Sequence, residues 1–327
     1  MAPLSFFPNP DNANAGIHVP MTALARRFYN AEFVGNYLFP TVIVSQRSGI
    51  EYEFSKTQFQ VMNDLRSPGA RYPEMQFGYE GRPYKLEDRG LQLAFTQESE
   101  EEARIVGLDL GSLVPEDLMN GVGLSLESQQ AEIASNPANY DSDNVFDLGP
   151  GEHWDETDPE PLMREAASII TLKTGKRPNL LLFGNEAFDG TSGGAAVRAR
   201  MIHTNANSLT EDMLGTMFNM KKVVVGRAVG MNTPLSNPSF LWGNIAILAY
   251  VNPTALKTGR IPYEGNSRIS RYSQSFGYTK VRKGHPYVDK PRFCADTKTK
   301  KTLVTYQRHP SIVAPGAGVL IRNVASA

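Results

Sequence analysis

The feature that most constrains this chain is residues 50–95, a long stretch whose middle has little regular pattern. It opens as a strand, because Ile50, Tyr52 and Phe54 alternate with glutamates. It closes in a second apolar-rich run, made of Tyr84, Leu86, Leu91, Leu93 and Phe95. The residues between the two runs are rich in Gly, Pro and Arg. Loops longer than about 15 residues are uncommon in compact domains and are usually functional. We therefore expect an extended arm that lies on a neighbouring molecule.

Composition sets the broad class of the chain. Its 327 residues, of which 41% are hydrophobic and 20% charged, suffice for a sizeable core in one large domain or two closely associated domains. The net charge of −1 argues against a dedicated nucleic-acid binder. The one cysteine, Cys294, excludes a disulfide within the chain and favours a reducing compartment. No apolar run approaches the roughly 18 residues of a membrane span, and the first residues lack the pattern of a secretory signal.

The first half of the chain shows an arm followed by helices and a strand. Residues 1–20 are rich in Pro, Asn and Ala and are expected to be extended. Apolar spacing predicts a helix over residues 21–37, which ends before Pro40 because the residue preceding a proline avoids the helical region. Residues 41–44 are β-branched and predict a short strand.

Two further helices are predicted after the long loop. Residues 99–102 have the capping-box pattern with acidic residues in the first turn. Pro115 suits the first position of a long helix that ends near Pro137. Gly121 and Gly123 lie inside that helix, where each costs about 1 kcal/mol relative to alanine, so they favour close backbone packing.

The second half alternates helix and strand, which predicts an α/β layer. A helix over residues 159–174 ends at Gly175, and residues 184–186 turn from a strand into another helix. Strands are expected at residues 179–183, 223–226 and 245–251, and a further helix at 209–218. From Gly265 onward the pattern becomes strands with polar turns, including 302–306, 312–314, 318–321 and a charged hairpin tip at 296–301.

The patterns that carry catalysis or metal binding are weak. His153, Asp155 and Glu156 are nearly contiguous and do not readily converge on one metal ion. Residues 190–194 lack the lysine of a phosphate-binding loop and are expected to be a flexible turn. A nucleophile elbow of the form GxSxG is absent, and Cys294 is expected to be a small buried residue. We expect no enzyme activity, no cofactor and no metal site.

Basic residues form small clusters. A solvated face or ion pairs between subunits explain them best, and sequence-independent contact with packaged phosphate is the alternative. The clusters lie at residues 26–27, 221–222, 280–283 and 298–301.

The order of these elements resembles a known family. An arm precedes residues 30–42, whose Leu38-Phe39-Pro40-Thr41-Val42 is similar to a segment found in many phage coat proteins, as is Ser67-Pro68-Gly69 inside the loop. A long helix, an α/β region and closing strands that include residues 312–318 follow. The chain looks like the major capsid protein of a tailed double-stranded DNA bacteriophage, of the type named after phage HK97.

The resemblance implies an α+β fold of the HK97-like type with five parts. These are an N-terminal arm (1–48), an extended hairpin called the E-loop (49–95), a P-domain with a spine helix (96–140), an A-domain (141–264) and strands that return to the P-domain (265–327).

The resemblance also implies a function and partners. Pentamers and hexamers of the chain would form an icosahedral shell that holds the phage DNA without sequence specificity. A separate scaffolding protein is expected, because no long helical segment precedes the arm, together with a portal and, as an option, a decoration protein. The location is the virion, after assembly in the bacterial cytoplasm and away from membranes.

Intersubunit contacts are expected on the loop and on the arm. The E-loop residues are Tyr52, Phe54, Leu65, Arg66, Arg71, Tyr72, Tyr79, Tyr84 and Leu86. The arm residues are Phe6, Phe7 and His18. Lys56 and Lys85 lie near the ends of the loop and away from its tip, so noncovalent joints are expected in place of the lysine crosslinks of the type member.

Two other functions fit the same sequence. A nanocompartment shell of the encapsulin type shares the fold and encloses cargo protein instead of DNA. A hydrolase-type α/β enzyme is the second alternative, since a fold can hold a site without a linear motif.

Overall fold

A computed structural model describes residues 17–27, 30–54, 61, 64–66, 71–72, 79–201, 209–231, 237–253 and 275–326. The chain divides into two compact units. The first comprises Met1–Ala31, Leu86–Leu126 and Val281–His309, and the second comprises Glu32–Lys85, Glu127–Lys280 and Pro310–Ala327. Within the described part of the chain, every helix is too short or too polar to cross a lipid bilayer.

The first unit packs helices on an antiparallel sheet. Its elements include α1 (Val19–Arg27), β4 (Glu87–Thr96), α3 (Gln97–Ile105), β12 (Tyr287–Val288) and β13 (Arg292–Cys294), with α4 (Leu110–Ser135) up to Leu126 and β14 (Thr299–Ile312) up to His309. Strand β14 pairs with β4, β12 and β13, in each case antiparallel. Ala25 of α1 and Leu118 and Val122 of α4 form one core with Val288 and Val304 of the sheet.

A buried arginine reinforces this unit. Arg308 of β14 is 1% exposed, and it donates to the carbonyl of Val122 at 2.8 Å and to Oγ of Ser125 at 3.0 Å. Burial lowers the pKa of Arg308 to about 10, so the guanidinium stays charged at neutral pH. Since both acceptors lie on α4, the side chain ties that helix to the sheet by charge-assisted hydrogen bonds.

The second unit is an α/β layer with a separate hairpin. Its helices include α2 (Gly35–Leu38), α5 (Glu160–Thr174), α6 (Asn185–Gly193), α7 (Ala195–Met201) and α8 (Glu211–Met217). Its strands include β1 (Thr41–Val44), β2 (Ser48–Phe54), β3 (Tyr79–Lys85), β5 (Val145–Asp147), β6 (Leu180–Gly184), β7 (Lys222–Gly226), β8 (Val229–Gly230), β9 (Ser239–Phe240), β10 (Ile245–Ala249), β11 (Gly277–Arg282) and β15 (Gly318–Arg322).

Five strands of this unit form one mixed sheet in the order β5-β15-β10-β6-β7. Alternate residues of β6 enter different cores: Leu180 and Leu182 pack with α2 and the end of α4, whereas Leu181 and Phe183 pack with α5 and α6. Both faces of the sheet are therefore covered, which explains why the strands are continuous apolar runs. The predicted α/β layer is confirmed.

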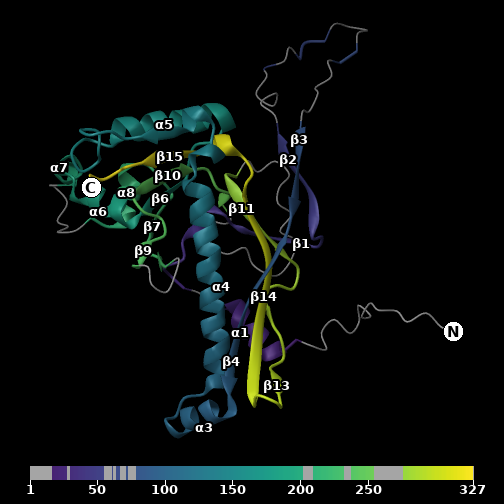
Figure 1. Ribbon diagram of the computed structural model, residues 1–327. Coiled ribbons are helices and arrows are strands. Elements are labelled where there is room, and N and C mark those ends of the chain that lie inside the picture. The colour runs from purple at the N-terminus through teal and green to yellow at the C-terminus, as the bar shows by residue number, and fades with distance from the viewer. Residues whose placement is uncertain are drawn as a thin grey trace. The chain divides into compact units, whose positions relative to one another are not determined.

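The hairpin is shorter than predicted. Strands β2 and β3 pair in antiparallel register from Ser48↔Lys85 to Phe54↔Tyr79 (Figure 1). Residues 87–96 form β4, which pairs with β14 instead. Leu93 and Phe95 pack against the core of the first unit, so these residues of the second apolar run belong to that core and not to the arm.

The predicted helix over residues 21–37 is wrong as a single helix. The structure has α1 and, after a break, the single turn α2. The backbone N–H groups of Val34 and Gly35 donate to the carboxyl group of Glu127 at 3.0 and 2.9 Å. A tertiary partner therefore takes two donors that a continuous helix would have used internally.

Two helix starts also differ from the prediction. Helix α3 begins after Thr96, whose Oγ1 accepts from the N–H of Ser99 at 3.1 Å, so Thr96 and not Ser99 is the cap. Helix α4 begins at Leu110, and Asp109 accepts from the N–H of Gly111 at 3.0 Å. Pro115 thus lies inside the helix, near enough to its start that only one early hydrogen bond is lost.

Of the strands predicted to return over residues 265–327, those at 281–309 lie in the first unit, whereas residues 310–327 belong to the second. Strand β15 pairs antiparallel with β10 and parallel with β5, so it is part of the α/β sheet and not a return strand. Val319, Leu320 and Ile321 are fully buried, and their continuous apolar run suits a sheet with two covered faces. Residues 190–193, expected to be a turn, are the end of helix α6.

Candidate functional site

The arm beyond the β2–β3 hairpin exposes apolar side chains. Of the residues described there, Val61, Leu65 and Tyr72 are 97%, 81% and 71% exposed. The guanidinium of Arg66 lies 4.6 Å from the centroid of the Tyr72 ring, a cation–π distance. Apolar groups held this far out of a core are typical of a surface that binds a partner.

The base of the hairpin is anchored in its own unit. Lys280 of β11 is 5% exposed, lies 4.6 Å over the ring of Tyr84, and donates to Oγ of Ser311 at 2.9 Å. Gly49 lies opposite Tyr84, and a Cβ at Gly49 would stand 2.8 Å from the Tyr84 hydroxyl. The base is therefore packed in its own unit, and the exposed candidate residues Leu65, Arg66, Arg71 and Tyr72 lie beyond it.

The predicted loop residues fall into three groups. Leu65, Arg66, Arg71 and Tyr72 are exposed, and the structure brings Arg66 and Tyr72 together. The backbones of Tyr52, Phe54 and Tyr79 form the β2–β3 ladder, and their side chains are outside the described part. Tyr84 is half-buried in the base. The expectation for Leu86 is wrong, because its side chain is 7% exposed and packs within its own chain.

Of the arm residues, only His18 is described. Its Nδ1 accepts from the N–H of Met21 at 3.2 Å, which caps α1, and its own N–H donates to the carbonyl of Val288 at 2.9 Å. Its contact with another subunit stays a prediction. Phe6 and Phe7 lie outside the described residues.

A second exposed apolar patch lies at the end of α3 and in the turn after it. Ile105, Val106 and Leu108 are 85%, 77% and 50% exposed, and Gly107 has a φ of 84° that turns the chain there. The sequence signal is an apolar pair next to a glycine directly after an acidic helix. We call these three apolar residues the α3 turn, and they form a second candidate contact surface.

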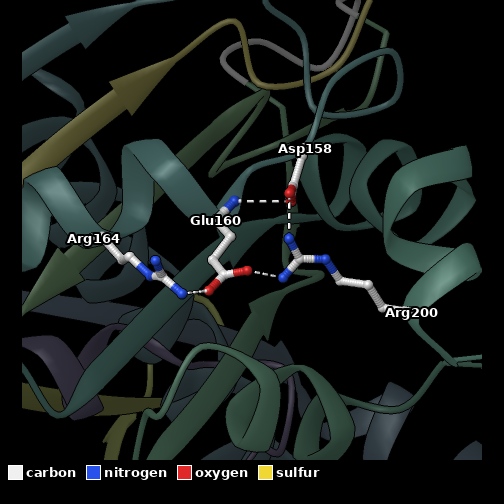
Figure 2. A network of polar contacts seen from close by, with 4 residues as sticks. All are labelled: Asp158, Glu160, Arg164 and Arg200. Atoms are coloured by element: carbon white, nitrogen blue, oxygen red, sulfur yellow. Dashed lines mark hydrogen bonds and ion pairs between the residues drawn. The ribbon is translucent and has the colours of Figure 1, made fainter.

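A polar network holds α7 to the start of α5 (Figure 2). The guanidinium of Arg200 on α7 donates to Asp158 and to Glu160, and Arg164 pairs with the other oxygen of Glu160. Asp158 also accepts from the N–H of Glu160 at 3.1 Å. The network therefore ties the last turn of α7 to the start of α5.

The residues considered for metal binding or nucleophilic chemistry have other roles. His153 Nδ1 donates to the carbonyl of Asn323 at 2.8 Å, Trp154 is buried, and hydrogen bonds from Ser326 lower the pKa of Asp155. Among the described residues, no three His, Cys, Asp or Glu side chains are grouped to hold a metal ion. Cys294, expected to be buried, is exposed on the short edge strand β13.

Comparison with known proteins gives related chains over nearly the full length. The chain is 26% identical over 307 residues, 93% of its own length and 95% of the other's, to the "Major capsid protein" of Burkholderia phage BcepMu. A crystal structure of a phage-related protein from Bordetella bronchiseptica RB50 is similar with a TM-score of 0.76 and 27% identity, covering 94% of this chain and 98% of that one. The capsid structure of cyanophage P-SCSP1u is similar with a TM-score of 0.55 and 8% identity, covering 88% and 87%. No protein-family model matches the chain.

Proposed function

We propose that this chain, whose α+β fold is that of HK97-like phage capsid proteins, is a major capsid protein. It is a structural protein whose copies assemble as pentamers and hexamers into an icosahedral shell that encloses double-stranded phage DNA. The observation that carries this function is the β2–β3 hairpin, which is anchored at its base and carries exposed Leu65 and Tyr72 away from any core of its own.

The hairpin gives a thin subunit the contact area that a shell requires. Obligate interfaces commonly bury about 2,000 Å² or more, and an arm draped on a neighbour supplies area without enlarging the core. Leu65 and Tyr72 are the apolar anchors of this contact, and Arg66 stiffens Tyr72 before docking. The α3 turn is a second contact surface.

The parts of the subunit take the corresponding roles. The first unit is the P-domain with α4 as its spine helix, and the five-stranded layer of the second unit is the A-domain. The chain assembles in the host cytoplasm with a scaffolding protein and a portal, becomes part of the virion, and holds packaged DNA without sequence specificity. A decoration protein is a further optional partner.

Electron microscopy of the expressed chain tests this function. We expect closed shells of uniform size, with or without a co-expressed scaffolding protein. In the double variant Leu65→Asp/Tyr72→Asp, buried charges at the docked surface abolish assembly while circular dichroism stays that of a folded subunit.

Leu172→Asp is the matched control, because Leu172 is a single exposed leucine on α5, 80% exposed, away from the hairpin. It should leave assembly intact. Discrete monomers of the unaltered chain under all conditions, including co-expression with the scaffolding protein of the same phage, would contradict the proposed function.

A further inference from the structure

Glu127 is a buried carboxyl group that holds the segment Val34–Phe39 to α4. Its side chain is 1% exposed. Its Oε1 accepts from the N–H of Val34 at 3.0 Å, from the N–H of Gly35 at 2.9 Å and from Nε1 of Trp242 at 2.7 Å. Its Oε2 lies 3.0 Å from the N–H of Gly35, a donor already directed at Oε1. Oε2 is therefore the less well satisfied of the two oxygens.

Gln130, three residues further along the same helix, has its amide orientation set by other groups. Its Nε2 donates to Oγ1 of Thr279 at 2.9 Å and to Oδ1 of Asn36 at 3.3 Å. The Thr279 hydroxyl donates its single proton to the carbonyl of Phe39 at 3.1 Å. With that proton directed at Phe39, Thr279 accepts from Gln130, and Oε1 of Gln130 points the other way.

Oε1 of Gln130 has no hydrogen-bond partner, and of the buried side-chain nitrogens and oxygens in the described residues it alone lacks one. A Cβ at Gly35 would stand 2.2 Å from this oxygen and 2.9 Å from Oε2 of Glu127. Both oxygens thus lie beside the same point on Gly35, as expected for residues three apart on one helix face. With Glu127 ionised, two acceptors share a buried space with no proton between them, which is costly.

We propose that Glu127 is protonated in the folded subunit and donates from Oε2 to Oε1 of Gln130, which makes the attachment of Val34–Phe39 to α4 a proton-controlled latch. The bond explains the missing partner of Gln130 and leaves Oε1 of Glu127 free to accept from Val34, Gly35 and Trp242. When the proton leaves to solvent, the two oxygens repel each other and the attachment weakens.

The electrostatic surroundings support this arrangement. Burial raises the pKa of Glu127 to about 7, although the hydrogen bonds from Trp242, Gly35 and Val34 lower it. The titratable residues on the elements packed around it are Glu32 and Tyr37 beside α2, Glu116, Asp117 and Glu132 on α4, Lys222 on β7, and Tyr278, Lys280 and Arg282 on β11. No charged neighbour is among the causes of the shift. Lys222 lies over the Tyr37 ring and Lys280 over the Tyr84 ring, so each cation has a partner elsewhere.

Amide hydrogen exchange at Val34 and Gly35 tests the latch on the unassembled subunit. Protection, corrected for the intrinsic rate, is compared at about pH 5.5 and about pH 8.5, on either side of a glutamate pKa near 7. We expect at least about a tenfold loss of protection at the higher pH. In Glu127→Gln the loss disappears, because a neutral amide donates to Gln130 and accepts from the backbone at every pH.

Glu132→Gln, an exposed glutamate of the same helix, is the control and should behave as the unaltered chain does. Equal protection at the two pH values in the unaltered chain would overturn the proposal, as would a Glu127→Gln variant that keeps the pH-dependent loss.

A second measurement does not depend on the variant folding. Carboxyl carbon NMR of the glutamate-labelled subunit should show one resonance that titrates near 7, above the ordinary range of about 4.3. If every glutamate titrates in the ordinary range, Glu127 is ionised and the Gln130 amide is reversed, and the latch does not exist.

Discussion

Glu127 and Gln130 decide how the segment Val34–Phe39 lies, and neither is its neighbour in sequence. The segment contributes Val34, Leu38 and Phe39 to the core under the α/β sheet. Its position, however, depends on backbone donors that point at Glu127 and on the close approach of Gly35 to both side chains. Gly35→Ala tests the close approach by adding a methyl group, and Glu127→Gln tests the carboxyl group by replacing it with a neutral amide.

Gly35→Ala should destabilise the subunit by about 1–3 kcal/mol, because the new methyl group would overlap Oε1 of Gln130 and both helix and segment must shift. Urea unfolding followed by tryptophan fluorescence measures the loss. Gly193→Ala is the control, since a Cβ there meets nothing within 4 Å. Similar effects of the two substitutions would show that crowding at Gly35 is not the cause.

Glu127 also makes stability depend on pH in a defined direction. Its pKa rises from 4.5 to about 7 on folding, so the folded state binds the proton more tightly. The stabilisation is complete below pH 4.5 and is lost as the pH rises to about 7, and it amounts to roughly 3 kcal/mol at most. The difference in unfolding free energy between the unaltered chain and Glu127→Gln should change by this amount across that range. A difference that does not vary with pH would contradict the shift.

At the scale of elements, the β2–β3 hairpin is a structural base with a separable arm. Phe54 and Tyr79 are register partners, so a two-residue turn can join them directly. The base is anchored by Tyr84 and Lys280 and does not require the arm for its packing.

Replacing residues 55–78 by Asn-Gly should therefore leave a folded subunit and abolish shell assembly. Circular dichroism and sedimentation velocity measure the two properties. If the shortened chain unfolds, the arm belongs to the core; if it still forms shells, the arm is not the main contact between subunits.

Helix α7 depends on a polar network at its end. Arg200→Met should cost about 1 kcal/mol, since Arg200 is 37% exposed and its ion pairs with Asp158 and Glu160 are partly screened by solvent. Hydrogen exchange should increase across α7 and little elsewhere. Arg198→Met is the control, because Arg198 donates only to the carbonyl of Ser192 among the contacts described for it. Exchange that rises equally in both variants would mean that α7 is not held by this network.

At the scale of the whole molecule, the contents of the shell separate a phage capsid from the nanocompartment that is its alternative. The curated relative is a phage capsid protein, which favours the phage and leaves the nanocompartment less supported. We expect shells isolated from a natural lysate to hold DNA.

The measurement is the ultraviolet absorbance of nucleic acid relative to that of protein, before and after nuclease treatment of the opened shell. Shells from the expressed chain alone are the control for adventitious nucleic acid. A DNA-free natural shell that holds a second protein would contradict the phage capsid function and support the compartment.

Elements with local signals could be predicted from the amino-acid sequence. Helix α5 lies between Pro159 and Gly175, which has a φ of 65°, and β6, β7 and β10 are continuous apolar runs. The arm was predicted from a long stretch rich in Gly, Pro and Arg between two apolar runs. The order of the elements indicated the family. These features depend on dihedral preferences and on burial, both of which are carried by neighbouring residues.

Features that depend on partners far along the chain became visible only in the folded molecule. Strand β15 joins the α/β sheet because β10 and β5 are there to pair with it. Strand β4 is not part of the arm, because it pairs with β14 over ten residue pairs, and Leu86 next to it is buried. The start of α2 is held by Glu127, which accepts from the N–H of Gly35 and lies 92 residues further along the chain. Backbone donors and buried side chains bond to and pack against groups that are near them in space. The spacing of residues along the chain does not identify those groups.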